Sequence, residues 1–536
     1  MSVEKLIVDH MEAWTSALQT RSTAGRGSSG KIDLYGIKKL RELILELAVR
    51  GKLVPQDPND EPASELLKRI ATEKAELVKQ GKIKKQKPLP EISEEEKPFE
   101  LPEGWEWVRL GTLFNSILSG GTPSKINSAF WGGDIPWASV KDLGSSQYIS
   151  KTQDYITEVG LSSGSRLADE GDILICTRMG LGKIAITLCP MAFNQDLKSV
   201  KLTKSLIPEY FFNAYRTVKI NGTGTTVEGI KQEQLVNYII GLPPLKEQKA
   251  IVTKIKKLMS FCDQLEQQSL ASLDAHQQLV ETLLGTLTDS QNAEELAENW
   301  ARISEHFDTL FTTEASVDAL KQTILQLAVM GKLLNNTNNA DYKKLRTYLS
   351  FGPKNGLSPV ESKKETQLKV LKLGATSYGQ LNLNETKFID VDIEKDSHLF
   401  LKKGDILIQR GNSANFVGCN VLINEDYKNI IYPDLMMKIR TNDNLLPEYA
   451  SIWLSSPLVR NFMWDRMTGT SGTMPKISKK IVEEIPIIVP EISIQQKWIT
   501  TVNLMLDICS EIKYRLHKAK QTQLHLADAL TDAAIN

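Results

Sequence analysis

Apolar residues repeat at alternating steps of four and three along two stretches of the chain, the pattern of a long helix with a narrow packing seam. In the first stretch, after Pro243-Pro244, the seam residues are Ile251, Ile255, Leu258, Cys262 and Leu265. In the second they are Trp498, Val502, Met505, Cys509, Ile512, Leu516, Ala519, Leu526 and Leu530. We therefore predict two coiled-coil helices, each about 40 residues and roughly 60 Å long, that pair antiparallel.

A shorter apolar pattern occurs twice. The segments 40–54 (LRELILELAVRGKLV) and 320–334 (LKQTILQLAVMGKLL) are identical at nine of fifteen positions. Their apolar residues recur at i, i+3, i+4 and i+7, which predicts one buried helix face. Gly51 and Gly331 follow the last apolar turn, where helices commonly end in a residue with positive φ. Such a repeat predicts a duplicated architecture.

Three short strings occur in the same order in both halves and support the duplication. They are GDILI at 171–175 and 404–408, Pro-Glu-Tyr at 208–210 and 447–449, and Gln-Lys at 248–249 and 496–497. Each half is thus a strand-rich module followed by a long helix. We predict an α+β protein with two α/β modules, two long antiparallel helices and an internal pseudo-twofold duplication.

The chain divides on this basis into five parts. They are an N-terminal helical region with a charged linker (1–100), a first module (101–244), a central helical spacer (245–340), a second module (341–490) and a C-terminal coiled-coil helix (491–536). The linker runs from a lysine-rich stretch into a glutamate-rich one between residues 79 and 96. This composition predicts a solvated linker, with a DNA-binding arm as the alternative.

The charge balance limits how the chain could bind a polyanion. Lys plus Arg and Asp plus Glu each total 65, so the formal net charge is zero, which argues against coating nucleic acid or an anionic membrane by bulk charge. The first module has 13 basic and 13 acidic residues from residue 103 onward, and the second has 21 and 17. We therefore expect weak binding to nucleic acid by charge alone.

Cysteine usage and hydropathy bear on the compartment. The five cysteines are widely spaced without a CxxC pair, which favours a reducing compartment and offers neither a disulfide framework nor a zinc site. No run reaches the ~18 apolar residues of a membrane span. The first residues lack the basic start and apolar core of a signal peptide. We expect a cytoplasmic protein with no membrane partner.

Familiar catalytic motifs are missing from the sequence. It contains no GxxxxGK[ST] phosphate loop, no HExxH and no GxSxG string. The six histidines do not share metal-ligand spacing. Leu242-Pro243-Pro244-Leu245 has the prolines of an amino-methyltransferase string but neither its amide or acid nor its aromatic residue. We therefore predict a binding protein without catalytic residues, metal or cofactor of its own.

The loops of the two modules carry the residue types that read base edges and hold phosphates. Arg178, Lys183, Gln409, Arg410 and Asn412 extend from the end of the shared strand and are the stronger candidates. The full candidate set is Thr122, Ser124, Lys125, Trp137, Lys141, Thr177, Arg178, Lys183, Asn194, Gln195, Ser377, Tyr378, Gln409, Arg410, Asn412, Ser413 and Asn415. For any one glycine or threonine in these loops, a plain turn is the simpler interpretation.

Five strings together resemble the specificity subunits of type I restriction-modification systems. They are SGGTPS (119–124), WGGDIPW (131–137), GDILI followed by GLGK (171–183), NQD (194–196) and LPPLKEQKAIV (242–252). The string ELAVRGKLVPQDPNDEPASELL at 46–67 resembles one branch of that family. The second module lacks GGTPS, IPW and NQD, a divergence that two domains reading different half-sites would show.

The resemblance implies a non-catalytic DNA sequence-recognition subunit. Each module would be a target-recognition domain that reads half of a split site in double-stranded DNA, and the helices would act as a ruler for the gap. The implied partners are two modification (methyltransferase) subunits and the restriction/translocase subunits, in a site-specific deoxyribonuclease and adenine methyltransferase complex. S-adenosylmethionine, ATP and Mg would belong to those partners, which would also supply much of the phosphate grip.

Two other functions remain as alternatives from the residues. One is a protein–protein scaffold whose modules bind proteins rather than DNA, and the other is a self-sufficient DNA methyltransferase. Half-sites about one helical turn, ~34 Å, apart would suit a rigid spacer with a reader at each end. Methyl transfer by the isolated chain would favour the self-sufficient enzyme.

Overall fold

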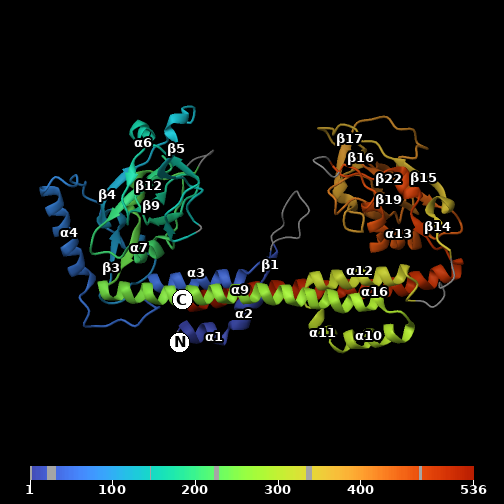
Figure 1. Ribbon diagram of the computed structural model, residues 1–536, viewed down its shortest axis with the longest axis horizontal. Coiled ribbons are helices and arrows are strands. Elements are labelled where there is room, and N and C mark those ends of the chain that lie inside the picture. The colour runs from blue at the N-terminus through green and yellow to red at the C-terminus, as the bar shows by residue number, and fades with distance from the viewer. Residues whose placement is uncertain are drawn as a thin grey trace. The chain divides into compact units, whose positions relative to one another are not determined.

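The computed structural model describes residues 3–20, 32–144, 146–222, 228–333, 341–469 and 474–535 (Figure 1). The chain separates into two compact units. Unit 1 comprises Met1–Leu18, Leu34–Gln268 and Gln523–Asn536, and unit 2 comprises Gln19–Asp33 and Ser269–Thr522. Helices and sheets are mixed in both units, which confirms the predicted α+β class. The two longest helices, α9 (Leu245–Asp289) and α16 (Ile492–Ile535), contribute residues to both units.

The described residues of the first module form three sheets. A five-stranded sheet has the order β4-β12-β9-β10-β6, a four-stranded sheet has the order β7-β5-β11-β8, and β13 pairs with β3. The strands are β3 (Glu106–Arg109), β4 (Phe114–Ser119), β5 (Trp131–Ala138), β6 (Tyr148–Ile149), β7 (Asp154–Ile156), β8 (Leu167–Ala168), β9 (Ile173–Cys176), β10 (Ile184–Thr187), β11 (Met191–Phe193), β12 (Leu197–Leu202) and β13 (Ile239–Leu242).

The second module has sheets in a matching order. Its two four-stranded sheets are ordered β15-β22-β19-β20 and β17-β16-β21-β18, and β14 pairs with β23. The strands are β14 (Lys343–Lys344), β15 (Leu349–Asn355), β16 (Leu368–Leu371), β17 (Thr386–Ile389), β18 (Phe400–Leu401), β19 (Asp405–Gln409), β20 (Asn420–Leu422), β21 (Tyr427–Ile431), β22 (Met436–Thr441) and β23 (Pro486–Ile487). One further pair, β1 (Gln19–Thr20) with β2 (Ile32–Asp33), lies outside the modules.

The strand predicted over GDILI is confirmed in both modules. It forms β9 and β19, each fully buried and each paired antiparallel with two neighbours. The aspartates of the two strings, Asp172 and Asp405, play the same local role. Each carboxylate accepts the backbone N–H of the residue three positions earlier, at 3.1 Å from Asp169 and 2.9 Å from Lys402. An acidic turn thus starts this strand in both modules.

Some helices pack against the sheets within the modules, and others lie outside the modules. The module helices are α5 (Leu110–Leu113), α6 (Glu158–Gly164), α7 (Pro208–Tyr215), α8 (Gln232–Asn237), α13 (Pro447–Ser455), α14 (Pro457–Trp464) and α15 (Lys479–Glu483). The other helices besides α9 and α16 are α1 (Val3–Asp9), α2 (Met11–Ser16), α3 (Tyr35–Val49), α4 (Ala63–Lys79), α10 (Ala293–Glu305), α11 (Phe307–Leu310) and α12 (Glu314–Val329).

The repeated helix of residues 40–54 and 320–334 is a third partner for the long helices, which the sequence analysis did not foresee. In unit 1 this helix is α3, where Arg41 forms ion pairs with Asp263 and Glu266 of α9, and Tyr35 donates a hydrogen bond to Asp528 of α16. In unit 2 it is α12, which shares an apolar cluster with α9, α10, α11 and Cys509 of α16. Leu334, the last residue of the repeat, lies outside the described residues.

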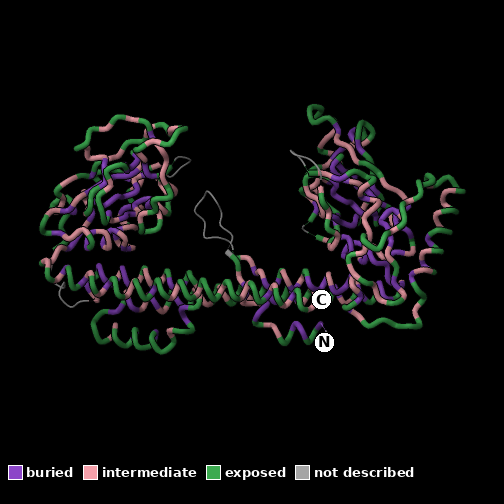
Figure 2. Tube along the Cα trace, turned by 180° about the vertical axis from the view of Figure 1, so that it is seen from behind, coloured by how far each residue is buried: buried purple, intermediate pink, exposed green. Residues whose placement is uncertain are grey.

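The predicted seam of the C-terminal helix is correct at its start and wrong near its end. The seam residues of α9 are all buried, as are Trp498, Val502 and Cys509 of α16, whereas Ala519 is exposed and Leu526 is 45% exposed. The buried residue in that turn is Ala527. It lies five full turns of a straight helix after Cys509, at about 3.6 residues per turn, so a strict 3.5-residue seam drifts off the buried face. Figure 2 shows buried and exposed positions alternating along these helices.

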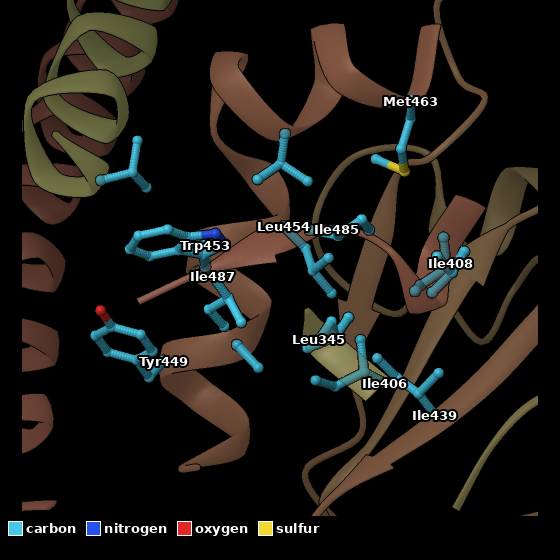
Figure 3. Packing of buried hydrophobic residues seen from close by; sticks show 14 of the residues in the cluster. Leu345, Ile406, Ile408, Ile439, Tyr449, Trp453, Leu454, Met463, Ile485 and Ile487 are labelled. Carbon is cyan, nitrogen blue, oxygen red and sulfur yellow. The ribbon is translucent and has the colours of Figure 1, made fainter. Parts of the chain in front are cut away.

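The sheet of the second module shares one apolar core with the helices beneath it. Ile406, Ile408 and Ile439 from the sheet belong to the same apolar cluster as Tyr449 and Trp453 of α13 (Figure 3). The same cluster continues to Leu325, Ala328 and Val329 of α12 and to Trp498 and Val502 of α16. Protein interiors pack as densely as crystals. This continuous core therefore attaches the second module rigidly to α12 and α16.

A glutamine of each long helix holds the corresponding module in place. Gln248 of α9 accepts the N–H of Ile207 at 3.0 Å, and Gln495 of α16 accepts the N–H of Leu446 at 2.9 Å. Both N–H groups immediately precede the Pro-Glu-Tyr string, and both glutamines are fully buried. The sequence alignment of Gln248 with Gln496 was therefore off by one residue, because the buried partner is Gln495.

The charged stretch after α4 is exposed for most of its length yet anchored to the first module. The Gln86 side chain donates to the Phe114 carbonyl at 2.9 Å. Arg109 is buried and donates to the carbonyls of Pro90, Glu91 and Asn237 and to the Glu96 carboxylate, all within 2.9 Å. Solvation of its lysines agrees with the linker prediction, but the segment from 86 to 96 is packed against the module.

Candidate nucleic-acid interface

The candidate loops of the first module lie at one edge of its sheets. Strands β4 and β9 both pair antiparallel with β12, so they run in the same direction, and β5 pairs parallel with β11. The loops that follow these four strands contain residues 120–127, 177–183, 139–144 and 194–196. All of the candidate residues of this module except Trp137, which is the penultimate residue of β5, lie in these loops.

Hydrogen bonds join three of the loops into one network around Asp196. The Asp196 carbonyl accepts both the N–H and the hydroxyl of Thr177, at 2.8 and 3.1 Å. Asn194 and Asp196 bind each other through side chain and backbone, at 3.3 and 3.1 Å. The Thr122 hydroxyl donates to the Gln195 side chain. Hydrogen bonds between candidate residues therefore fix the positions of these loops relative to one another.

Arg178 is held at the rim of this network. One guanidinium nitrogen lies 3.7 Å from the Asp196 carboxylate, yet the side chain is 53% exposed. The backbone of residue 178 is also bridged to Gly229. A positioned guanidinium with further donors facing solvent is the group best suited to bidentate recognition of a base edge or a phosphate.

The other candidate residues divide into an exposed and an enclosed group. Ser124, Lys125, Lys141 and Gln195 are exposed, and Thr122 and Lys183 are half-buried. Lys183 donates to the Val140 carbonyl at 3.2 Å. Trp137, Thr177 and Asn194 are buried, so their side chains support the loops from within.

The two glycines of SGGTPS are required by close backbone contacts. A Cβ on Gly120 would lie 2.0 Å from the Asn194 carbonyl oxygen, and one on Gly121 would lie 1.8 Å from the Gly164 carbonyl oxygen. The Gly121 carbonyl in turn accepts the indole N–H of Trp137 at 3.1 Å. Only glycine allows this approach, so the motif lets this loop lie directly against the backbone of Gly164 in α6 and of Asn194.

In the second module, Gln409 has the organising role. It is fully buried at the end of β19, and its amide nitrogen donates to Leu373, Thr376 and Ser377 at 2.9 to 3.0 Å. Its amide oxygen accepts from Asn412 at 2.7 Å, and Asn412 accepts the N–H of Ser413. Gln409 therefore ties the loop of residues 373–378 to the loop of residues 410–415.

The exposed groups of the second module lie on these two loops. Tyr378 is 80% exposed, and its ring meets that of Phe416 edge to face at 5.7 Å. Asn415 is exposed, and its carbonyl accepts from Arg460 at 2.8 Å. Arg410 is half-buried, with its backbone N–H bonded to the Leu435 carbonyl at 2.8 Å. Here again an enclosed polar residue positions exposed ones.

A buried charge cluster within the sheet of the second module, on β19 and β22, was not predicted from the sequence. Asp405 accepts from Lys438 at 3.0 Å and from Arg440 at 2.5 Å, and both Asp405 and Lys438 are almost completely buried. Burial lowers the pKa of Lys438, against the opposing attraction of Asp405. In the first module the equivalent Asp172 binds Ser199 at 3.0 Å instead. The aspartate that both GDILI strings contain is the sequence feature that could have indicated this cluster. Its side-chain partner, however, differs between the two modules.

The structure adds observations on metal sites, membrane-spanning helices and cysteines. Among the residues that it describes, no three His, Cys, Asp or Glu side chains gather as a metal site requires, and no helix is long and apolar enough to cross a membrane. The five cysteines are free thiols. Cys262 and Cys509 are buried, and burial raises the pKa of the Cys262 thiol to about 11.

Comparisons with known proteins agree in pointing to one family. A family model described as the type I restriction modification DNA specificity domain matches residues 102–275. The specificity subunits of the type I restriction enzymes EcoAI and EcoEI of Escherichia coli are 44% and 41% identical to the chain, each over the whole length of both chains.

A solved structure concerned with complex assembly and conformational transition of the type I R-M system matches in fold. Its TM-score is 0.50 at 17% identity, over 82% of this chain and 99% of that one. With the full-length relatives, the comparisons lead to a single conclusion. The chain belongs to the specificity subunits of type I restriction-modification systems and provides the DNA sequence specificity of such a complex.

Proposed function

We propose that each module reads one half of a split DNA site. The observation that carries this proposal is the common sheet order of the two modules, with different loops at the end of the shared GDILI strand. The scaffold is repeated while the exposed side chains differ, as two readers of unlike sequences require. Direct readout depends on side chains that reach base edges, and phosphate contacts only position the protein.

The candidate residues fall into two roles in this proposal. Exposed side chains such as Lys125, Arg178 and Tyr378 contact DNA. Buried ones such as Thr177, Asn194 and Gln409 hold the loops in register. Trp137 belongs to the second group because its indole N–H is bound to a loop carbonyl.

We further propose that the chain is an internal duplication in which α9 and α16 run antiparallel. The contacts of the repeated lysine support this. Lys52 donates to the Ile535 carbonyl at the end of α16, and Lys332, the matching lysine of the second copy, donates to the Thr288 and Ser290 carbonyls at the end of α9. Each copy of the repeat therefore caps a different long helix. Helices paired in this way would set the gap between the half-sites.

The chain is proposed to be non-catalytic and to work with partner subunits in the cytoplasm. Two modification subunits and the restriction/translocase subunits would supply the S-adenosylmethionine, ATP and Mg chemistry. Exposed apolar side chains on the long helices support docking of such subunits, among them Leu504, Ile508 and Tyr514 of α16 and Leu270 and Leu279 of α9. Such residues are favoured at interfaces rather than in free water.

The test is an exchange of residues 101–244 for the matching region of a relative with a known site. Methylated bases would be mapped in DNA from cells that carry the chimera and its partner subunits. We expect one half-site to change and the other to persist. Persistence of both original halves would contradict the proposal.

Controls separate the alternative functions. Purified chain assayed alone for methyl transfer should be inactive, and activity would indicate a self-sufficient methyltransferase. A complex that forms with the partner subunits but shows no sequence preference in duplex DNA would indicate a protein scaffold.

A further inference from the structure

A basic groove lies at the base of the first module, between the module and the helices of unit 1. It has a volume of about 980 Å³ and is bounded by the loops near Tyr148 and Lys183, the end of α7, and the face of α9 that carries Lys256. Its lining includes four basic and two acidic residues. The acidic groups are engaged, because Glu209 accepts from Tyr148 at 2.8 Å and Asp263 is paired with Arg41 at 2.6 Å.

Three cations of this groove have no carboxylate partner among the described residues: Lys183, which donates to the Val140 carbonyl, and two others. The two others are Arg216, whose guanidinium lies 5.5 Å from the centre of the Phe212 ring, and Lys256, which lies on α9. Both of these side chains are exposed, so an anion from outside the chain can reach them, and partial desolvation lowers the pKa of Arg216. A positive charge in such a setting favours an anion from outside the chain.

The second module has an equivalent groove of about 660 Å³, between α12, α13, α14 and α16. Lys321 occupies the position in the second copy of the repeat that Arg41, which lines the first groove, has in the first copy. Cys419 takes the place of Lys183, since each of their carbonyls accepts the N–H of the last residue of the GDILI strand. Met259 of α9 lines the first groove and Leu506 of α16 lines the second. The same concavity is therefore built twice.

The second groove is also basic. Lys321 and Arg460 line it, and none of the described residues that line it is acidic. Arg460 donates to the Asn415 carbonyl and stacks 5.1 Å from the centre of the Trp464 ring, so it is positioned without an ion pair to a described residue. Each groove thus has an excess of two positive charges within a chain whose net charge is zero.

We propose that the two grooves hold the sugar-phosphate backbone of double-stranded DNA next to each half-site. The inference rests on the proposed function and adds a phosphate-binding surface formed jointly by module and helix. Continuity favours DNA over an acidic protein segment, because candidate base-reading residues line both grooves: Lys183 in the first, Tyr378 and Asn415 in the second. Charge alone would suit either polyanion, whereas adjacency to the reading loops suits only the duplex.

The experiment measures salt dependence in the complex of the full chain with its methyltransferase partners. The probes are a duplex containing the mapped site and a scrambled duplex, each titrated across a series of KCl concentrations. The variants are Arg216→Gln/Lys256→Gln for the first groove and Lys321→Gln/Arg460→Gln for the second. The slope of log K against log[salt] is negative, and each double variant should reduce its magnitude by about 1.8. This corresponds to about 0.9 for each phosphate that is no longer neutralised. Affinity should fall by the same factor on both probes, leaving site preference unchanged.

Matched controls are Lys257→Gln, which alters the exposed neighbour of Lys256 outside the groove, and Lys497→Gln on α16. Both should leave the slope unchanged. Unaltered slopes in both double variants would overturn the inference, as would loss of partner binding with an unaltered slope, which would identify an acidic protein segment instead. If the unmodified complex prefers neither duplex, the proposed function fails, and the slopes still report on the grooves.

Discussion

At the scale of single residues, the carboxylate of Asp405 neutralises the positive charge of Lys438, which is buried in the second module. Asp405→Asn leaves Lys438 buried with its charge uncompensated, and breaking a buried pair in this way costs about 3–5 kcal/mol. Hydrogen exchange of the β19 and β22 amides should show this loss of stability. Asp169→Asn is the control, since it breaks the exposed Lys201–Asp169 pair and should cost less than about 1 kcal/mol. Equal effects would contradict the argument.

The buried lysine also predicts a pH dependence. Burial lowers the folded-state pKa of Lys438 below its ordinary value of 10.5, so the unfolded chain holds that proton more tightly than the folded one. Stability from this group therefore rises as pH increases toward 10.5. The Asp405→Asn variant should regain part of its lost stability over this range when unfolding is followed against pH. If the stability lost by the Asp405→Asn variant increased with pH, the predicted direction of the pH dependence would be wrong.

Glu96 predicts the opposite behaviour at acid pH. The hydrogen bond from Arg109 lowers the pKa of Glu96 to about 2 from 4.5. Its contribution is fully present above 4.5 and is lost as pH falls from 4.5 toward 2. Hydrogen exchange of residues 86–97 should therefore accelerate in this range. In Glu96→Gln, exchange should be faster already at neutral pH and change less on acidification.

Arg178 is the residue whose substitution most directly tests base readout. Arg178→Ala should cost about 1–3 kcal/mol on the site containing its base pair if the contact is bidentate. Competition binding against single-base variants of the mapped site measures this. Lys125→Ala, on a neighbouring exposed loop, is the comparison. A loss equal on every duplex would show that Arg178 contacts phosphate instead.

Residue types and spacing were enough to find the loops but not each side chain's role. Arg178 and Gln409 both follow the buried core of the GDILI strand, yet one is 53% exposed and the other fully buried. Gln409 is the last residue of β19, as the equally buried Cys176 is of β9. Residues 373–377 accept the amide hydrogens of Gln409, whereas Arg178 lies two residues beyond its strand. Sequence spacing along one strand does not record which distant loop folds over its end.

At the scale of elements, the repeated lysine explains why the short helix is duplicated with its Gly-Lys ending. Lys332 binds two carbonyls at the end of α9, where the last turn lacks intrahelical partners and the helix dipole is negative. Lys332→Met removes the charge and keeps the stem. It should destabilise unit 2 by about 1 kcal/mol, measured by hydrogen exchange near residues 284–290. Lys321→Met, on α12 itself, should have little effect there.

The predicted buried positions of the long helices are correct over the first turns, because a heptad repeat of 3.5 residues per turn and a straight helix of about 3.6 differ little over a short length. The error appears at Leu526, where the accumulated drift moves the heptad position off the buried face. Helix α3 adds a further cause, since it contributes Tyr35 to a bond with Asp528 of α16. A helix with two neighbours buries a wider stripe than a two-stranded seam, and no pattern within α16 alone identifies the second neighbour.

At the scale of the whole molecule, the proposed ruler makes a quantitative prediction. Seven residues of helix inserted after Gln268 in α9 and seven after Thr522 in α16, where the units divide, add about 10.5 Å to each helix at about 1.5 Å per residue. With a rise of about 3.4 Å per base pair, the gap between half-sites should lengthen by about three base pairs. The half-site sequences should not change, because the reading loops are untouched. Mapping methylated bases in cells that carry the extended chain measures both. Seven residues inserted into α9 alone mismatch the two helices and should lower stability without creating a longer gap. An unchanged gap in the doubly extended chain would show that something other than helix length sets the spacing.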